Sequence, residues 1–258
     1  MATNTAAEMH LVALPEFPRV QSGDDLAGFT MDALNRVGLQ LRPDDVLVFA
    51  QKIVSKAEGC RIDLATIVPS PKALELAQTV QKDPRLVELV LRESRRIVRA
   101  ARDVLIVEHR LGMIMANAGI DQSNVAEPDR DYALLLPENP DASAMRLRER
   151  LGALCGCEPG IIISDSFGRP WRQGTVGVAI GCAGVAAILD LRGRTDLFGR
   201  LLRVTIVGHA DEIASAASIL MGQASEARPV ILVRGLSTRA CHQSAAALLR
   251  PPAEDLFR

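Results

Sequence analysis

The sequence predicts a mixed α+β fold, an irregular α/β arrangement with a two-lobed protomer. Short apolar runs that are typical of buried strands are interleaved with segments whose apolar residues recur at helical spacing. These runs and segments do not alternate as regularly as in a doubly wound parallel sheet. Pro128 and the Pro137–Pro140 stretch mark a loop region in the middle of the chain, which we expect to separate the lobes.

The helices are predicted from amphipathic spacing and capping residues. Residues 24–37 place apolar side chains on one helical face, and Ser22 is available as the N-cap. Ser70 and Asp83 each precede a proline, which suits the first turn of a helix. Two more helices are predicted over residues 142–154 and 211–220. Strands are predicted over residues 10–14, 46–54, 104–108, 161–164, 204–207 and 230–233.

The helix that begins after Asp83 is predicted to continue to Arg102. It would carry a run of arginines, which is typical of a solvated helix face. The alternative is a surface for an anionic ligand or a partner subunit. These arginines are Arg92, Arg95, Arg96, Arg99 and Arg102.

Composition and charge exclude several classes of protein. The 258 residues suffice for a substantial core, and 30 basic against 31 acidic residues lack the basic excess of a nucleic-acid-binding protein. Residues 176–189 form the longest uninterrupted apolar run, which is shorter than the ~20 residues of a membrane span. The N-terminus lacks the layout of a signal peptide. We therefore expect a cytoplasmic protein that binds neither nucleic acid nor a membrane.

The chain has five cysteines, and two of them are separated by a single glycine. The spacing of Cys155 and Cys157 does not match the usual geometry of a zinc site. Free thiols buried near a strand are the prediction, and metal binding or redox cycling is the alternative. The single tryptophan, Trp171, is predicted to be a core anchor.

Much of the glycine lies between residues 168 and 199. Gly177, Gly181 and Gly184 serve either the packing of helices or the close approach of a ligand to the backbone.

Three segments combine small residues, carboxylates and cations. In residues 51–59, Lys52 and Lys56 could contact phosphate oxygens, although the chain contains no P-loop motif. The alternative for this segment is a polar strand exit. In residues 112–124, Asp121 offers a hard oxygen to a divalent cation and Asn124 offers an amide to a base or phosphate. The alternative there is an ordinary Asx turn.

The third segment, residues 163–174, is an apolar strand end followed by Asp165 and Ser166. A carboxylate and a hydroxyl at this place suit a magnesium site. Arg169 and Arg172 could neutralise phosphate or carboxylate groups beside it.

The four histidines form neither a recognisable metal motif nor a catalytic triad. Nucleotide and divalent-metal chemistry therefore fits the residues better than a hydrolytic nucleophile does. The histidines are His10, His109, His209 and His242.

Taken together, five segments resemble the coenzyme F420-0:L-glutamate ligase family, in its stand-alone form without an additional reductase domain. They follow the order of the family and predict a ligase domain over residues 11–236, between a flexible N-terminus (1–10) and a C-terminal tail (237–258). The segments are LPEF at 14–17, KIVSKAEG at 52–59, GMIMANAGIDQSN at 112–124, SDSFGRPWRQG at 164–174 and PVILVRG at 229–235.

The resemblance implies a GTP-dependent ligase that joins L-glutamate to the lactyl carboxylate of the deazaflavin coenzyme F420-0. It implies an acyl-phosphate intermediate, and it extends to the addition of further γ-linked glutamates. Two sites for magnesium or manganese, stimulation by potassium and an intertwined homodimer belong to the same expectation. The alternatives are a related amide ligase that acts on another carboxylate, and a non-catalytic nucleotide- or metal-binding regulatory module.

The resemblance also implies roles for individual residues. Asp121 and Asp165 would bind one metal, and Ser166 with Gln223 would help to hold a second. Lys56, Arg169 and Arg172 are the candidates for neutralising phosphate or substrate carboxylate during catalysis. The residues expected to contact the nucleotide are Leu14, Pro15, Glu16, Phe17, Gln51, Lys56, Asn124, Met221, Gly222, Gln223, Ala224, Ser225, Glu226, Ala227 and Arg228.

Overall fold

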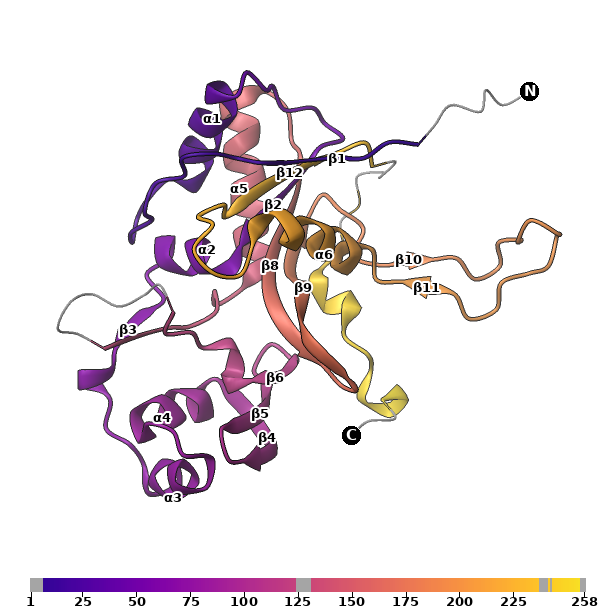
Figure 1. The fold of residues 1–258 in the computed structure, drawn as a ribbon. Helices are drawn as coiled ribbons and strands as arrows, with labels where there is room; N and C mark the ends of the chain where they lie inside the picture. Colours follow the sequence, from indigo (N-terminus) through magenta and orange to yellow (C-terminus); the bar gives the residue numbers. More distant parts are fainter. Residues whose placement is uncertain (1–6, 124–130, 237–240, 242, 256–258) are drawn as a thin grey trace, which may run out of the picture.

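The computed structural model describes residues 7–123, 131–236, 241 and 243–255, and it has two lobes (Figure 1). The first lobe is built on a five-stranded sheet in which β2 and β8 are parallel and the other neighbours are antiparallel. In spatial order its strands are β1 His10–Ala13, β12 Val230–Arg234, β2 Val46–Ala50, β8 Gly160–Arg169 and β9 Arg172–Ala183. The mixed α+β class predicted from the sequence is confirmed.

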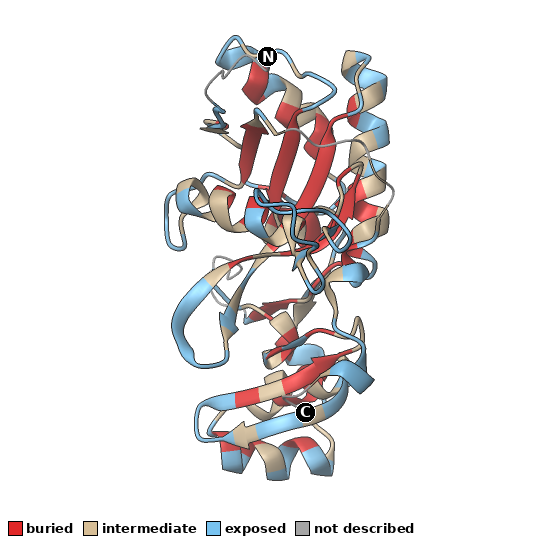
Figure 2. Ribbon diagram, turned by 90° about the vertical axis from the view of Figure 1, so that its right-hand side faces the viewer, coloured by how far each residue is buried: buried red, intermediate tan, exposed pale blue. Residues whose placement is uncertain are grey.

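Helices cover both faces of this sheet. The side chains of β2 alternate, so that Leu47 and Phe49 join one core cluster and Val46 and Val48 join the other. Figure 2 shows the buried central strands. The first cluster lies under α1, α2 and α5, and the second lies under α6. The bounds are α1 Leu26–Arg36, α2 Gln51–Ala57, α5 Pro140–Cys155 and α6 His209–Met221.

The second lobe is inserted between α2 and α5. Its first and last strands, β3 and β7, pair antiparallel, so the chain leaves and re-enters the first lobe at neighbouring points. A sheet of β4, β5 and β6 packs with α3 and α4 around a separate core that includes Val87, Leu105 and Val107. The bounds are β3 Arg61–Asp63, η1 Leu64–Thr66, α3 Pro71–Val80, α4 Pro84–Arg92, β4 Ser94–Ala101, β5 Val104–His109, β6 Ile114–Ala116, η2 Asn117–Gly119 and β7 Tyr132–Leu134.

Polar side chains cap the N-termini of several predicted helices. The side chains of Ser70 and Asp83 accept hydrogen bonds from backbone N–H groups in the first turns of α3 and α4, which confirms both as caps. In α1 the cap is Asp25, which accepts from the N–H of Gly28 at 3.1 Å, so the assignment to Ser22 was wrong. Within the described ranges, no helix is both long and apolar enough to cross a membrane.

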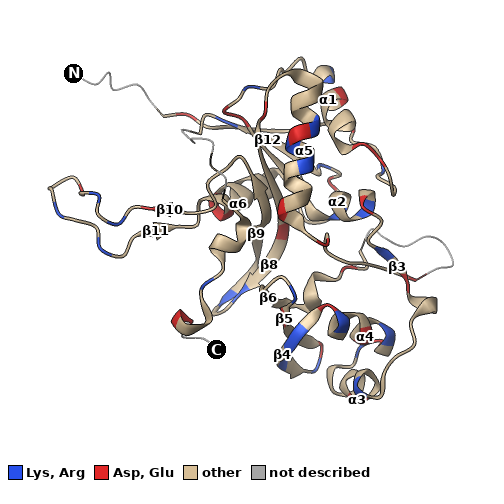
Figure 3. Cartoon of the chain, turned by 180° about the vertical axis from the view of Figure 1, so that it is seen from behind, with Lys and Arg blue, Asp and Glu red and all other residues tan. Residues whose placement is uncertain are grey.

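The arginine-rich segment is a strand. α4 ends at Arg92, and the next three arginines, Arg95, Arg96 and Arg99, lie on β4, whereas Arg102 lies in the turn after it. Figure 3 shows the basic residues of β4, which pairs with β5 across two register irregularities. The β-branched Ile97 and Val98 favour extended backbone, and Arg96 Nε donates to Glu108 Oε2 across the strands at 2.7 Å. The predicted continuation of the helix to Arg102 is therefore wrong, because strand pairing outweighs the helical start signal at Asp83.

The chain turns from strand to helix at Gln51, within the segment predicted as one strand over residues 46–54. Ile53 and Val54 pack into the core beneath the sheet, and Ala57 contacts the same cluster one turn later. The second half of that strand prediction is wrong, because these apolar residues follow a helical period. Lys52 and Lys56 consequently lie one turn apart on α2.

Glycines on β9 let helices approach the sheet closely. A Cβ on Gly177 would lie 2.4 Å from the backbone oxygen of Ala214 in α6. A Cβ on Gly181 would meet the carbonyl carbon of Pro140 in α5, also at 2.4 Å. Of the two roles considered for these glycines, helix packing is the one that the geometry supports.

Gly177→Ala is expected to lower the free energy of unfolding by about 1–3 kcal/mol, because the added methyl group overpacks against the α6 backbone. Gly168→Ala is the matched control, since a Cβ there would meet no heavy atom within 4 Å. Chemical denaturation of both variants measures the difference. Equal midpoints would contradict the packing role of Gly177.

Two projections leave the first lobe. Trp171 lies at the tip of the β8–β9 hairpin and is 88% exposed, so its predicted role as a core anchor is wrong. The second projection, which we call the arm (residues 189–207), contains β10 (Leu189–Asp190) and β11 (Ile206–Val207) and extends away from the body (Figure 1).

The chain after β12 returns to the edge strand β9. Asp141 Oδ1 accepts hydrogen bonds from the backbone N–H groups of Cys182 and Ala245, both at 2.9 Å. Asp141, at the start of α5, thereby connects β9 to η3 (Ala245–Leu248), which is followed by η4 (Pro252–Glu254).

All five cysteines are free thiols, as predicted, but only Cys182 is buried and the others are half-buried. Burial raises the pKa of Cys182 to about 12. Burial, together with a hydrogen bond to Cys155, raises the pKa of Cys157 to about 11. Both thiols therefore keep their protons at neutral pH, and neither has the thiolate character of a reactive cysteine.

Candidate functional site at one edge of the sheet

Three distant segments meet at the carboxyl ends of β2 and β8. Because these strands are parallel neighbours, with Ala50 paired to Ser164, α2 begins beside Asp165. The third segment comes from the second lobe, where an isolated bridge pairs Asp121 with Leu134 in β7. Ligands of open α/β sheets bind outside the carboxyl ends of parallel strands. The junction of the two lobes is therefore the candidate site.

Lys52 connects the two lobes within this site. Its Nζ lies 2.6 Å from Asp121 Oδ2 and donates to Ser123 Oγ at 2.7 Å. The backbone N–H of Ser123 donates to Asp121 Oδ1 at 2.6 Å, so Asp121 also forms the Asx turn that was considered as its alternative role. The Asx turn holds the carboxylate in place while its other oxygen faces the lysine.

The ionisable groups of the site perturb one another. Burial raises the pKa of Asp165 to about 6; nearby Asp121 adds to this effect, whereas the N–H of Ser166 and the charge of Lys52 oppose it. Burial also tends to raise the pKa of Asp121, but hydrogen bonds from Lys52 and Ser123 hold this pKa below its usual range. Burial and the neighbouring Lys52 lower the pKa of Lys56. Such coupled groups at a junction of lobes are typical of functional sites.

Asp165→Asn is expected to stabilise the metal-free protein near pH 7.5 but not near pH 4. With a pKa of about 6, against 3.8 in an unfolded chain, the folded protein binds this proton more tightly than the unfolded chain does. Stability therefore falls as pH rises from about 4 to about 6, by an amount on the order of 2 kcal/mol, and Asn removes that loss. Denaturant unfolding in a chelator at both pH values measures it. An equal effect at the two pH values would contradict the raised pKa.

Ser166 joins β8 to the loop after α6. Its Oγ donates to Gln223 Oε1 at 2.8 Å, and both side chains are exposed. Gly222 ends α6 with a φ of +75°, which turns the chain toward β8. In the segment that the resemblance assigns to the nucleotide, Met221 and Gly222 are half-buried, and Gln223, Ala224, Ser225, Glu226, Ala227 and Arg228 are exposed.

The other expected nucleotide contacts lie at the same edge of the sheet. β1 and β2 both pair antiparallel with β12, so the ends of β1 and β2 and the start of β12 coincide. The backbone N–H of Leu14 donates to Val230 O, and that of Ala50 donates to Pro229 O. The turn after β1 contains buried Leu14, half-buried Pro15, exposed Glu16 and half-buried Phe17, and α2 begins with buried Gln51.

The two arginines proposed to neutralise phosphate or substrate carboxylate lie away from the candidate site in this protomer. Arg169 and Arg172 pair across the tip of the β8–β9 hairpin. Arg169 is four residues beyond Asp165, which corresponds to about 13 Å along an extended strand. Asn124 lies outside the described residues.

The donor set of the site is made of oxygen atoms. Among the described residues, no three His, Cys, Asp or Glu side chains converge as a ligand cluster. A cation here would therefore rely on the carboxylates of Asp121 and Asp165, supplemented by oxygens such as those of Ser166 and Gln223. Carboxylate, hydroxyl and amide oxygens are hard ligands that suit magnesium and manganese.

The site residue that sequence reasoning undervalued is Lys52, which was considered only as a phosphate contact. Its position one turn before Lys56 was a signal, but the strand predicted over residues 46–54 included Lys52. Its pairing with Asp121 and Ser123 joins residues about 70 positions apart (71 for Ser123), and this contact depends on the fold of the second lobe.

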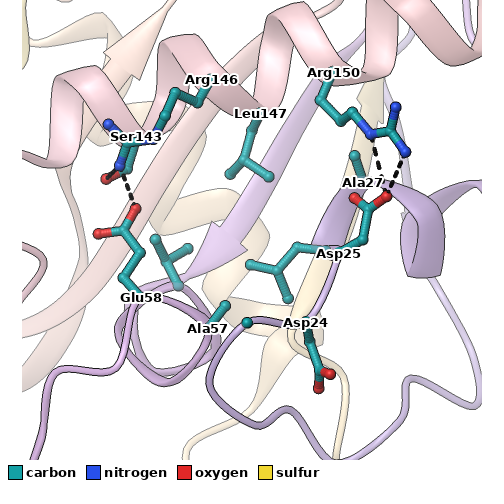
Figure 4. A pocket seen from close by; sticks show the side chains of 12 residues that line it. Asp24, Asp25, Ala27, Ala57, Glu58, Ser143, Arg146, Leu147 and Arg150 are labelled. Carbon is teal, nitrogen blue, oxygen red and sulfur yellow. Dashed lines mark hydrogen bonds and ion pairs between the residues drawn. The ribbon is translucent and has the colours of Figure 1, made fainter.

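One cavity of the described residues lies in the first lobe, and another is lined by residues of both lobes. Figure 4 shows one of about 260 Å³ between α5 and the segments that precede α1 and follow α2. In it, Arg146 contacts Glu58 at 2.6 Å and Arg150 contacts Asp25 at 2.8 Å, so its cations are already paired. The other, of about 250 Å³, is lined in part by Phe167 of β8 and lies beside the candidate site.

A family profile and individual protein sequences match this chain and agree on one family. The sequence profile of the F420-0:Gamma-glutamyl ligase family matches residues 15–235. The chain is 46% identical to the coenzyme F420:L-glutamate ligase of Methanopyrus kandleri, over 97% of this chain and 98% of the relative. It is 46% identical to the enzyme of the same name from Methanothermobacter thermautotrophicus, over 96% and 98% of the two chains. The corresponding protein of Halorubrum lacusprofundi is 42% identical over 88% and 87%.

Proposed function

The chain belongs to the F420-0:γ-glutamyl ligase family, and on that premise we propose that it joins L-glutamate to the lactyl carboxylate of the deazaflavin coenzyme F420-0 in a GTP-dependent reaction. The relatives are coenzyme F420:L-glutamate ligases, which supports a ligase activity toward this coenzyme and glutamate. Further γ-linked additions are part of the proposal. The observation that carries it is the convergence of Asp121, Asp165, Lys52 and Lys56 where the two lobes meet.

The carboxylates at the junction suit a divalent cation. Asp165 is half-buried and close to a second carboxylate, and both its burial and this neighbour raise its pKa. A divalent cation between Asp121 and Asp165 would offset both the burial and the mutual repulsion. Ser166 and Gln223, which already contact each other, are the proposed ligands of a second cation. Such cations would neutralise phosphate oxygens during phosphoryl transfer.

The proposed reaction has two steps. An oxygen of the acceptor carboxylate attacks the γ-phosphorus of GTP, and GDP leaves with the bonding electrons, which gives an acyl phosphate. The glutamate amine then attacks the acyl carbon, phosphate leaves with its bonding electrons, and the nitrogen loses a proton. We assign Lys52 and Lys56 to neutralise phosphate oxygens in both steps, which is supported by their positions one turn apart beside the acidic pair.

The direct test incubates purified protein with F420-0, L-glutamate, magnesium and either GTP or ATP, and follows the product by mass spectrometry. A mass increase of a glutamate residue with GTP is expected, with stimulation by potassium and loss of product in a chelator. Repeated increases would report γ-linked additions. No increase with GTP would reject the ligase proposal, and equal rates with ATP would reject the preference for GTP.

We further propose that the protein acts as a homodimer in the cytoplasm. The arm supports the dimer, because it carries apolar side chains that the protomer leaves uncovered: Leu197 is 97% exposed, Phe198 95% and Val204 85%. Large exposed apolar side chains on a projecting segment are typical of subunit interfaces. The five free cysteines are in keeping with a reducing compartment.

Replacement of both Leu197 and Phe198 by Asp is expected to convert the dimer into a monomer, because two charges would then have to be buried in the interface. Sedimentation velocity or light scattering measures the mass. The control is Arg194→Asp on the same arm, which changes charge without removing apolar area. A double variant with the mass of the wild-type dimer would contradict an interface through the arm.

A further inference from the structure

We propose that the cavity beside Asp165 binds the aromatic ring system of the deazaflavin acceptor, and that η3 forms one wall of this ring site. The inference rests on the proposed function, because that function supplies the acceptor. It assigns a substrate-binding role to the cavity and to η3. Neither of them takes part in the proposed phosphoryl transfer.

Strand register connects the cavity to the reacting groups. Asp165 on β8 is paired directly with Val178 on β9, and Val178 lines the cavity. Phe167 lines it too, and it lies two residues after Asp165 on the same face of β8, about 7 Å along the strand. The cavity therefore begins where the acidic edge of the site ends.

The lining of the cavity suits a flat apolar ring. Apolar side chains from the second lobe, from both strands of the hairpin and from the C-terminal segment converge on it, and the volume of about 250 Å³ suits part of a coenzyme. The aromatic and thioether side chains of Phe167 and Met113 are groups that stack well on rings. The main apolar contributors are Met113, Phe167, Val178, Ile180, Leu248 and Leu249.

The distribution of charged residues around the cavity determines which end of the acceptor enters it. Among the described residues, those that line the cavity include no Lys or Arg, so it offers no counter-ion for phosphate or carboxylate groups. Both carboxylates that line the cavity accept hydrogen bonds from backbone N–H groups. Asp211 Oδ1 accepts from the N–H of Ala179 at 2.9 Å, and Asp141 Oδ1 accepts from the N–H groups of Cys182 and Ala245. The cations lie on α2, on the other side of Asp165. An acceptor would thus place its ring in the cavity and its anionic end toward Lys52 and Lys56.

The wall formed by η3 offers a matched pair of variants. Ala246 and Ala247 are neighbouring exposed residues in η3, but only Ala246 lines the cavity. Ala246→Trp would insert a ring into the cavity without disturbing the core, whereas Ala247→Trp adds the same side chain outside it.

The probe is a deazaflavin nucleoside that carries the ring and its sugar alcohol but neither phosphate nor lactate. Its binding to the full-length protein is followed by its fluorescence, without nucleotide or metal. Ala246→Trp is expected to weaken binding at least tenfold, and Ala247→Trp to leave it within twofold of wild type. Phe167→Leu, which keeps apolar volume but removes the aromatic face, is expected to weaken binding about threefold to tenfold.

Two results would overturn the ring site: wild-type protein that converts F420-0 but does not bind the nucleoside, or equal affinities of the Ala246 and Ala247 variants. Failure of the proposed function is distinct. In that case the nucleoside binds and responds to Ala246→Trp, yet no product forms from F420-0, glutamate and GTP.

Discussion

Asp165→Asn is expected to reduce the rate of ligation at least about a thousand-fold while the protein stays folded. Asn keeps the shape of the side chain but supplies a neutral amide in place of the half-buried carboxylate. Metal-assisted charge stabilisation in phosphoryl transfer amounts to several kcal/mol, and ~4 kcal/mol corresponds to a factor of about a thousand. Product mass in the presence of GTP measures the rate, and circular dichroism measures folding.

A second measurement separates loss of the metal from other effects. Binding of Mn²⁺ to the variant, followed by electron paramagnetic resonance, is expected to weaken together with the rate. Asp83→Asn is the control, because this carboxylate caps α4 in the second lobe and Asn caps equally well. Wild-type turnover by Asp165→Asn would refute its assignment as a metal ligand.

Asp45→Ala is expected to cost about 3–5 kcal/mol of stability, the largest effect of a single change outside the site. The Asp45 side chain is fully buried, and both its oxygens accept hydrogen bonds from Arg234 at 2.7 Å. One oxygen also accepts from the backbone N–H of Arg42 at 2.8 Å. Removal of Asp45 leaves the Arg234 side chain, which is 17% exposed, with its hydrogen bond to Gln40 O but without its counter-ion.

Denaturant unfolding of Asp45→Ala is compared with that of Arg150→Ala. Arg150 also pairs with an aspartate, Asp25, but both side chains are about half exposed, so the loss is expected to stay below about 1 kcal/mol. Similar losses in the two variants would show that burial does not govern the strength of these pairs. Arg234 lies within the PVILVRG segment that supports the family resemblance, and the structure gives this residue a role in holding the sheet together.

Local signals in the sequence were sufficient for several elements. The caps at Ser70 and Asp83 and the apolar strand over residues 161–164 are encoded within a few residues, so the corresponding elements were predicted. The strand β4 was missed, because a helical start at Asp83 and a run of arginines conceal the pairing with β5. The exposure of Trp171 was missed too, because a large aromatic side chain is usually buried and the length of the hairpin was not apparent.

The sequence by itself determined the mixed fold class, the family and the residue types of the candidate site, because composition, capping and ordered motifs are local properties. Only the tertiary structure decided that Asp121 of the second lobe faces Lys52 of α2, and that Asp165 lies beside both. It also separated Arg169 from that cluster by placing it at a hairpin tip. The physical reason is that the parallel pairing of β2 with β8 and the docking of the inserted lobe bring together residues that are distant in the chain. Burial at this junction then strengthens the interactions between their charges and shifts their pKa values.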